Sequence, residues 1–209
     1  MNFFRLPGRV CLLLLFTALG WPPALAQDGI GSISRLTGGG IVTRLGQMGG
    51  IVMGQSLQVD DIVSSNAGSR IEISFVDGTR LTLGARALLR LDRYVFDPGG
   101  RRGRLAVFLQ GAARFVSGRL GKSPNDTIAV STAFGSIAGR GTDFWAGPID
   151  GEYGVFLLDG RVEVANGAGA ETLDEAGEGT MVVGPDAAPR AVTRWPAEKV
   201  DRALAAVAF

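Results

Sequence analysis

The sequence has 209 residues, 32 of them glycine, and its 21 Lys and Arg against 20 Asp and Glu give a formal net charge of +1. It contains no histidine and one cysteine, so the commonest general base, a thiol nucleophile and the preferred ligands of zinc and copper are almost entirely missing. The near-neutral charge argues against a dedicated nucleic-acid binder, which needs a basic face that displaces counterions.

The first 26 residues have the pattern of a cleaved signal peptide. Arg5 and Arg9 form a positive start, Val10–Leu19 is a short apolar core, and Ala24-Leu25-Ala26 is a small-residue cleavage site. An apolar run of about ten residues is too short for the roughly 30 Å of bilayer hydrocarbon, which disfavours a retained anchor. We therefore expect a periplasmic or secreted protein without a retained membrane span.

Cleavage near Ala26 would remove Cys11 and leave no thiol and no disulfide. The remaining chain of about 183 residues suits one domain with a sizeable core. Its glycine content is about twice the usual 7%, and these glycines lie between short apolar runs, which indicates many turns. Short strands without amphipathic helices between them favour an all-β fold over residues 27–183, as a compact β-sandwich or short β-roll of many short antiparallel strands.

The clearest local signal is the alternation of apolar and polar residues over residues 71–84. A two-residue turn at Asp77-Gly78 would place apolar residues opposite polar ones. A three-residue loop with Gly78 in the left-handed conformation instead pairs Ile73 with Leu81. We therefore predict a bulged hairpin.

A second Asp-Gly dipeptide, Asp159-Gly160, lies within the alternating run Val155–Val164 and predicts a second hairpin. Turn signals separate the strand candidates between the two hairpins. These candidates are Leu88–Leu91, Leu105–Leu109, Arg114–Val116, Thr127–Ser131 and Thr142–Trp145.

Residues 184–209 are expected to form a linker followed by a short C-terminal helix or tail. Gly184–Pro189 has the composition of a linker. Proline suits the first helical position, and Val200, Leu204 and Val207 follow helical spacing, so the helix would extend from Pro196 to about residue 206.

The sequence contains no recognisable catalytic constellation. A Ser–His–Asp triad is impossible without histidine, and neither Lys122 nor Lys199 has Ser-x-x-Lys spacing. Carboxylate pairs for glycoside hydrolysis stay open, although nothing selects such a pair. Acids such as Asp60-Asp61 lack calcium-loop spacing and are interpreted as turn residues. We expect no enzyme, no cofactor and no metal.

The glycine-rich run at residues 132–145, TAFGSIAGRGTDFW, fails both phosphate-binding patterns. It has no P-loop lysine, and Gly139-x-Gly141 is followed by Phe144 where a dinucleotide fingerprint needs a third glycine. We interpret it as a structural motif in which Arg140 reaches carbonyls or Asp143, while Phe144 or the next residue enters the core. The structural-motif residues are Asp77, Gly78, Gly139, Arg140, Gly141, Thr142, Asp143 and Phe144.

One basic neighbourhood is a candidate surface for an anionic partner, such as an anionic glycan, phospholipid head groups or an acidic protein. Solvated hairpin loops are the alternative explanation. Its members are Arg101, Arg102, Arg104, Arg114, Arg119 and Lys122.

Three motifs in this order and spacing resemble the FecR domain family over about Gly29 to Pro196. A fourth segment, Asp60–Asn66, matches the family's Gly-Asp-x-[Ile/Val]-x-Thr-Gly turn, with Asp60 and Asn66 where glycine is usual. Residues 132–142 match the family's second motif with four substitutions. The matching residues are Ser69, Arg70, Phe75, Asp77, Gly78, Thr79, Leu81, Leu83 and Gly84, then Arg140–Phe144, then Leu158, Gly160, Val162 and Val164.

The resemblance implies a β-rich periplasmic domain without catalytic residues. The name-giving members of the family span the membrane and relay iron-siderophore occupancy from an outer-membrane transporter to a cytoplasmic sigma factor. With no cytoplasmic segment expected, this chain is similar to free-standing exported members. We expect a non-enzymatic binding, interaction or regulatory module of the bacterial cell envelope, with a protein or glycan partner. The alternatives are an architectural scaffold, a glycan-binding protein and, remotely, a carboxylate-dependent glycan hydrolase; the oligomeric state stays open.

Overall fold

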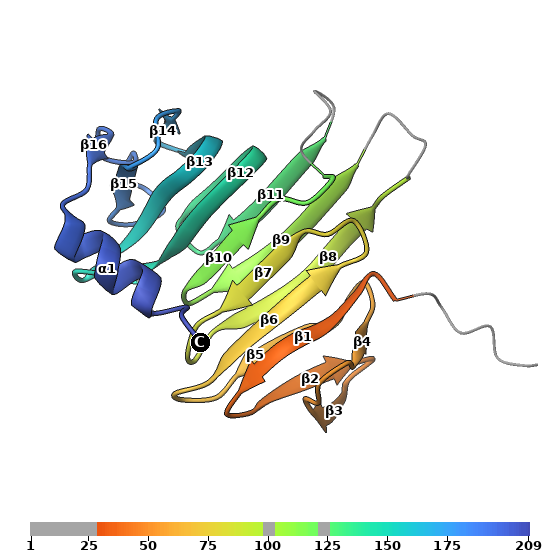
Figure 1. The fold of residues 1–209 in the computed structure, drawn as a ribbon. Helices are drawn as coiled ribbons and strands as arrows, with labels where there is room; N and C mark the ends of the chain where they lie inside the picture. The colour runs from red at the N-terminus through yellow and green to blue at the C-terminus, as the bar shows by residue number, and fades with distance from the viewer. Residues whose placement is uncertain (1–28, 98–102, 121–125) are drawn as a thin grey trace, which may run out of the picture.

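The computed structural model describes residues 29–97, 103–120 and 126–209 (Figure 1). The expected signal peptide and its cleavage near Ala26 lie outside the described residues. The described chain forms sixteen strands, joined in one curled mixed sheet, and one short helix. The predicted all-β class is therefore confirmed. No helix within the described ranges is long and apolar enough to cross a bilayer.

The elements have the following bounds: β1 Gly31–Thr37, β2 Gly40–Arg44, β3 Gln47–Gly50, β4 Ser56–Leu57, β5 Ile62–Ser65, β6 Arg70–Phe75, β7 Arg80–Leu83, β8 Leu88–Val95, β9 Arg104–Gln110, β10 Ala113–Val116, β11 Thr127–Thr132, β12 Gly135–Ile149, β13 Glu152–Asn166, β14 Gly169–Leu173, β15 Glu178–Val182, β16 Thr193–Arg194 and α1 Ala197–Ala205.

The sheet divides into two branches at the long strand β12. The first half of β12 pairs with β11, and from there the strand order continues through β9, β8, β5 and β2 to β3. The second half of β12 pairs with β10, and that branch continues through β7, β6 and β1 to β4. Both branches contribute to one hydrophobic core, which holds Phe115 and Leu81 of one branch together with Val107 and Ile128 of the other.

The first Asp-Gly hairpin has the predicted register. Ile73 pairs with Leu81, and the Phe75 N–H donates to the Thr79 carbonyl at 2.8 Å. Gly78 has φ +87°, the left-handed conformation that the three-residue loop requires. The alternation of side chains was sufficient to select this loop.

The predicted hairpin at Asp159-Gly160 is wrong. β13 runs continuously through this dipeptide, and the turn between β12 and β13 is made by Asp150-Gly151 instead, with φ +52° and +82°. Positive φ at both central residues is the type I′ geometry that Asp-Gly favours. Gly160 also has positive φ, +85°, but it lies at an irregularity within the strand and not in a turn. An Asp-Gly pair therefore specifies the backbone conformation without specifying a reversal of the chain.

The irregularity in β13 lies opposite a register shift in β12 between Arg140 and Asp143. Gly141 has φ +56° there, and a Cβ on Gly160 would lie 2.3 Å from the Gly141 carbonyl oxygen. Beyond the shift, Phe144 packs in the main core, with its ring 4.9 Å from that of Phe115. The next residue, Trp145, is fully buried on the other face of the sheet.

The C-terminal segment covers that other face of β12 and β13. β16 pairs with β15, and Trp195 stacks on Phe156 with ring centroids 5.2 Å apart. The predicted helix is present as α1, with Pro196 at its N-cap position. Figure 1 shows α1 lying at the β12–β13–β15 end of the molecule. Arg202 and Lys199 donate to Asp150 of the β12–β13 turn, and these hydrogen bonds lower the pKa of Asp150.

The contact between the two bulged strands predicts an intolerance to substitution at Gly160. Gly160→Ala should lower the free energy of unfolding by at least about 2 kcal/mol, because alanine at positive φ is strained and its Cβ would overlap a backbone oxygen. Gly167→Ala, where a Cβ meets nothing within 4 Å, is the matched control and should change stability by less than about 0.5 kcal/mol. Urea unfolding of both variants tests this, and equal midpoints would contradict it.

Candidate functional site

Asp77 of the first motif ties three parts of the chain together. Its buried carboxylate accepts hydrogen bonds from Thr79 Oγ1 at 2.6 Å, the Leu120 N–H at 3.0 Å and the Tyr94 hydroxyl at 3.0 Å. Burial, together with the nearby Asp77 charge, raises the pKa of Tyr94. The Gly118 N–H donates to Thr79 Oγ1 at 3.0 Å. These contacts use the carboxylate for structure, since they connect the β6–β7 hairpin with β8 and with the segment after β10.

In the second motif, the partner of Asp143 is Arg114 and not Arg140. Arg114 donates from Nε to Oδ1 at 2.8 Å and from Nη2 to Oδ2 at 2.6 Å, and this hydrogen bonding raises the pKa of Arg114. Arg140 is exposed and has no hydrogen bond or ion pair with any described residue. The expectation that Arg140 satisfies carbonyls or Asp143 is therefore wrong. The glycines and Phe144 shape the strand, whereas Arg140 is free for another role.

The predicted basic neighbourhood is only partly visible. Arg101, Arg102 and Lys122 lie outside the described residues. Of the other members, Arg114 is held by Asp143 and Arg119 lies over the Phe96 ring, 4.7 Å from its centroid. Arg104 is exposed at the start of β9. Among the described members of this neighbourhood, Arg104 alone has no partner within the described residues.

A different surface stands out at the β2–β3 end of the sheet. Residues 45–59 contain no charged side chain. β3 is exposed at all four positions and ends the strand order, so its outer edge is unpaired among the described strands. Six of the ten exposed large hydrophobic side chains of the described residues lie here: Ile41, Leu45, Met48, Val52, Met53 and Val59. We call this surface the uncharged edge.

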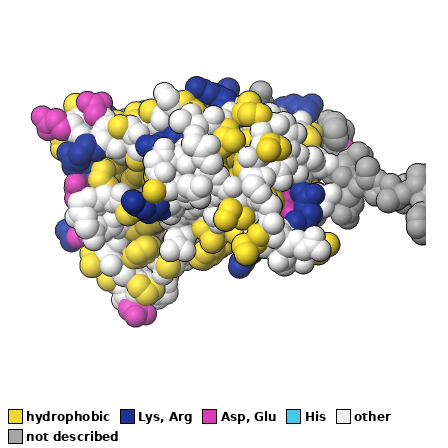
Figure 2. Space-filling view, turned by 90° about the horizontal axis from the view of Figure 1, so that it is seen from below, with side chains coloured by type: hydrophobic (Ala, Val, Ile, Leu, Met, Phe, Trp, Pro, Cys, Tyr) yellow, Lys and Arg dark blue, Asp and Glu magenta, His cyan; other side chains and the backbone are white. Residues whose placement is uncertain are grey.

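Figure 2 views the molecule from below Figure 1, where β2 and β3 lie, and shows hydrophobic side chains in groups across this face. Sequence reasoning did not single out this surface. The run of fifteen residues without a charge, 45–59, was the available signal. Its meaning depends on β3 being an edge strand, which only the strand order reveals.

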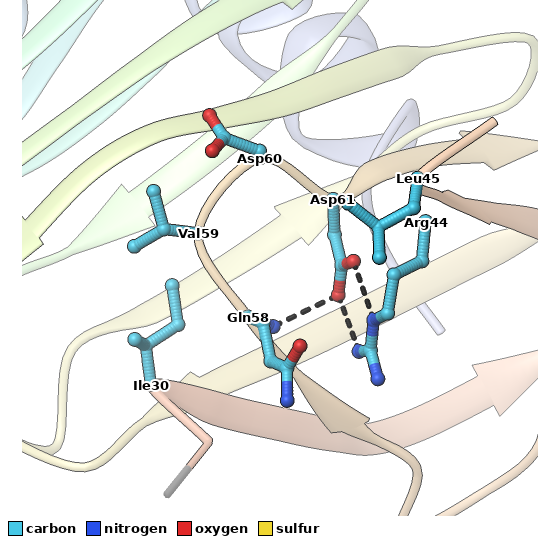
Figure 3. A pocket seen from close by; sticks show the side chains of 7 residues that line it. All are labelled: Ile30, Arg44, Leu45, Gln58, Val59, Asp60 and Asp61. Carbon is cyan, nitrogen blue, oxygen red and sulfur yellow. Dashed lines mark hydrogen bonds and ion pairs between the residues drawn. The ribbon is translucent and has the colours of Figure 1, made fainter. Parts of the chain in front are cut away.

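A hollow of about 430 Å³ opens beside the uncharged edge (Figure 3). Figure 3 shows Ile30 and Val59 on one side of the hollow, and Arg44, Asp61 and Leu45 on the other, while Asp60 points away. A second hollow of about 340 Å³ shares Arg44 and Leu45 with the first. Leu45 is 95% exposed, so an apolar side chain stands between two hollows.

The ion pair between Arg44 and Asp61 fixes the shape of the first hollow. Arg44 donates from Nε to Oδ1 at 2.7 Å and from Nη2 to Oδ2 at 2.6 Å, and the Gln58 N–H donates to Oδ2 at 2.8 Å. Asp61 is fully buried, whereas 37% of the Arg44 side chain is exposed. The hydrogen bonds with Asp61 raise the pKa of Arg44. The pair locks β2 to the turn before β5.

The turn that resembles the family's Gly-Asp motif begins with a left-handed residue that is not glycine. Asp60 has φ +70°, so an aspartate occupies the left-handed conformation at the position where the family uses glycine. Asp and Asn tolerate this region better than most residues. At the other end of the motif, the left-handed residue is Gly68 and not Asn66.

Residues 61–163 match the family model described as FecR protein. Residues 61–163 are therefore a FecR domain, which confirms the resemblance that the three motifs carried. The matched range includes the Asp77 hairpin and the register shift of β12.

Two crystal structures of a candidate anti-sigma factor from Parabacteroides distasonis ATCC 8503, at 1.65 Å and 2.50 Å resolution, are similar to this chain. Each has a TM-score of 0.54 and 21% sequence identity over 68% of this chain. The match covers 64% and 63% of those chains, so this chain spans slightly less than two thirds of their length. At this identity the similarity shows a shared fold. A search of curated proteins gave no match.

The Arg44–Asp61 pair predicts unequal effects of substitution at two adjacent aspartates. Asp61→Asn should lower the free energy of unfolding by about 2 kcal/mol, because it weakens three charge-assisted hydrogen bonds to a buried carboxylate. Asp60→Asn should change it by less than about 0.5 kcal/mol, since Asp60 is exposed and Asn tolerates its left-handed backbone. Thermal unfolding followed by circular dichroism measures both, and a larger loss for Asp60→Asn would overturn this ranking.

Proposed function

We propose that the protein is a non-enzymatic, exported binding module of the bacterial cell envelope with a regulatory role, and that the uncharged edge contacts its protein partner. The observation that carries this proposal is an exposed, uncharged edge strand with exposed apolar side chains on and beside it. The FecR domain at residues 61–163, and the fold shared with a candidate anti-sigma factor, support a regulatory role.

Edge strands present unpaired N–H and C=O groups and normally carry lysine, other charges or proline that prevent pairing with another chain. β3 and the residues up to Val59 carry neither charge nor proline. Met48 is 76% exposed and Val52 is 61% exposed. An uncovered edge of this composition is prone to pair with other chains and aggregate. This supports a partner that covers it.

The shape of the edge favours an extended protein segment as the occupant. A Cβ added at Gly49 or Gly50 would meet nothing within 4 Å, so a second backbone can approach β3 closely. Such a segment would add a strand to the sheet, with main-chain hydrogen bonds giving affinity and side-chain pockets giving specificity. The hollow between Val59 and Leu45 can accept an apolar side chain of that segment.

The buried carboxylates support binding over glycan hydrolysis. Asp61 is bound by Arg44, and Asp77 accepts three side-chain and main-chain hydrogen bonds. Asp126 accepts from the Gly103 N–H at 2.7 Å. Each is occupied by a structural donor. No group of three or more His, Cys, Asp or Glu in the described ranges is arranged to hold a metal ion.

An architectural scaffold is the second candidate function, and the same edge favours it. Two copies of β3 could pair across a two-fold axis without like charges meeting, because residues 45–59 are uncharged. Light scattering separates the two: a dimer that Met48→Lys dissociates supports the scaffold, and a monomer supports the heterologous partner.

The partner-binding proposal predicts that a charge on the edge abolishes capture. Met48→Lys should reduce recovery of the partner from cross-linked envelopes at least tenfold, because the lysine would be desolvated by the added strand. Val183→Lys places the same charge on an exposed apolar residue elsewhere, 54% exposed, and should leave recovery unchanged. Quantitative mass spectrometry of the captured proteins provides the measurement. Equal recovery with both variants would rule out the uncharged edge as the contact surface.

A further inference from the structure

A second surface lies on the outer face of β9, β11, β12 and β13, at the opposite end of the branch from the uncharged edge. Core residues such as Leu105 and Val162 alternate along these strands with outward-facing ones. Arg104 pairs with Thr127, and Arg140 pairs with Arg161. Ile128 pairs with Gly139, which places Thr127 beside Arg140. Arg104, Arg140 and Arg161 therefore lie in one row across four strands, which we call the arginine row.

The arginine row has no internal neutralisation. All three arginines are exposed, and none forms a hydrogen bond, ion pair or ring contact with any residue of the described chain. Arg140 and Arg161 stand directly opposite one another on adjacent strands, where like charges are destabilising. The fold does not need this arrangement, since stability would favour a neutral or opposite charge at either position.

A hollow of about 260 Å³ lies at the row, lined by Thr127, Ala138, Arg140, Arg161 and Glu163. Adjacent strands are about 4.8 Å apart, so the row extends over about 15 Å. Three guanidinium groups over this length match several anionic groups on one chain better than a single ion.

We propose that the arginine row binds an acidic polypeptide segment, with carboxylates of the segment seated between Arg140 and Arg161 and beside Arg104. Arginine clusters recognise acidic motifs through charge-assisted, two-point hydrogen bonds. Glu163 at the hollow accepts a hydrogen bond from a main-chain N–H of the segment and disfavours a dense phosphate dianion. The residues that line the hollow offer no aromatic face on which a sugar ring could stack.

This site is independent of the proposed function, because it shares no residue with the uncharged edge. The test uses the whole exported protein and a fluorescent decapeptide of alternating Glu and Gly, with fluorescence polarisation at about 50 mM and about 300 mM NaCl. The double variant Arg140→Gln/Arg161→Gln should weaken binding at least tenfold. Its melting temperature should stay equal or rise, because the substitution removes like-charge repulsion.

Arg80→Gln/Arg86→Gln is the control, since it removes two exposed arginines elsewhere and changes the net charge equally. Its affinity for the peptide should stay within twofold of the wild type. Absence of peptide binding, or equal losses in both double variants, would overturn the proposal. Polygalacturonate and inorganic phosphate are added as competitors in separate arms. Binding of either at the row in preference to the peptide would also overturn it.

Discussion

The architecture depends on the contact between Gly141 and Gly160, where two long strands bend together. The Gly141 carbonyl oxygen lies only 2.3 Å from where a Cβ of residue 160 would be, and both glycines have positive φ. The register shift between β12 and β13 lies between the part of β12 that pairs with β11 and the part that pairs with β10. The glycines that suggested a phosphate loop are therefore the point at which the sheet divides.

The consequences of this bend reach both faces of the sheet. Phe144 enters the main core and Trp145 the smaller one beneath the C-terminal segment. Asp143, just before them, is fixed by Arg114 on the neighbouring strand. Three adjacent residues of one short motif therefore contact, in turn, a neighbouring strand, the main core and the core beneath the C-terminal segment.

Local sequence was sufficient where the determining contacts are local. The Asp77-Gly78 hairpin was predictable with its register, because alternation on both sides permits only one loop length that pairs apolar residues. The role of Asp159-Gly160 was not predictable, since a left-handed glycine serves a turn and a bulge equally well. The partner of Asp143 was missed because Arg114 is 29 residues away, and only strand order brings them together. The uncharged edge was missed for the same reason.

The two proposed binding surfaces lie at opposite ends of the branch from β3 to β12 and have different chemistry. The uncharged edge offers main-chain groups and apolar side chains, whereas the arginine row offers charge alone. Strand addition at an edge gives a persistent contact, while an exposed charged row gives a faster, salt-sensitive one. A regulatory module with both surfaces can bind one partner persistently and a second partner transiently.

The most direct test of the account is site-specific cross-linking from the uncharged edge in living cells. The only cysteine of the chain, Cys11, lies in the segment expected to be cleaved, so a cysteine introduced at Met48 or Val183 would be the single site for a photo-activatable probe. The account predicts a discrete protein adduct from position 48 and none from position 183. No adduct from position 48, or the same adduct from both positions, would contradict the claim that this edge binds a protein partner.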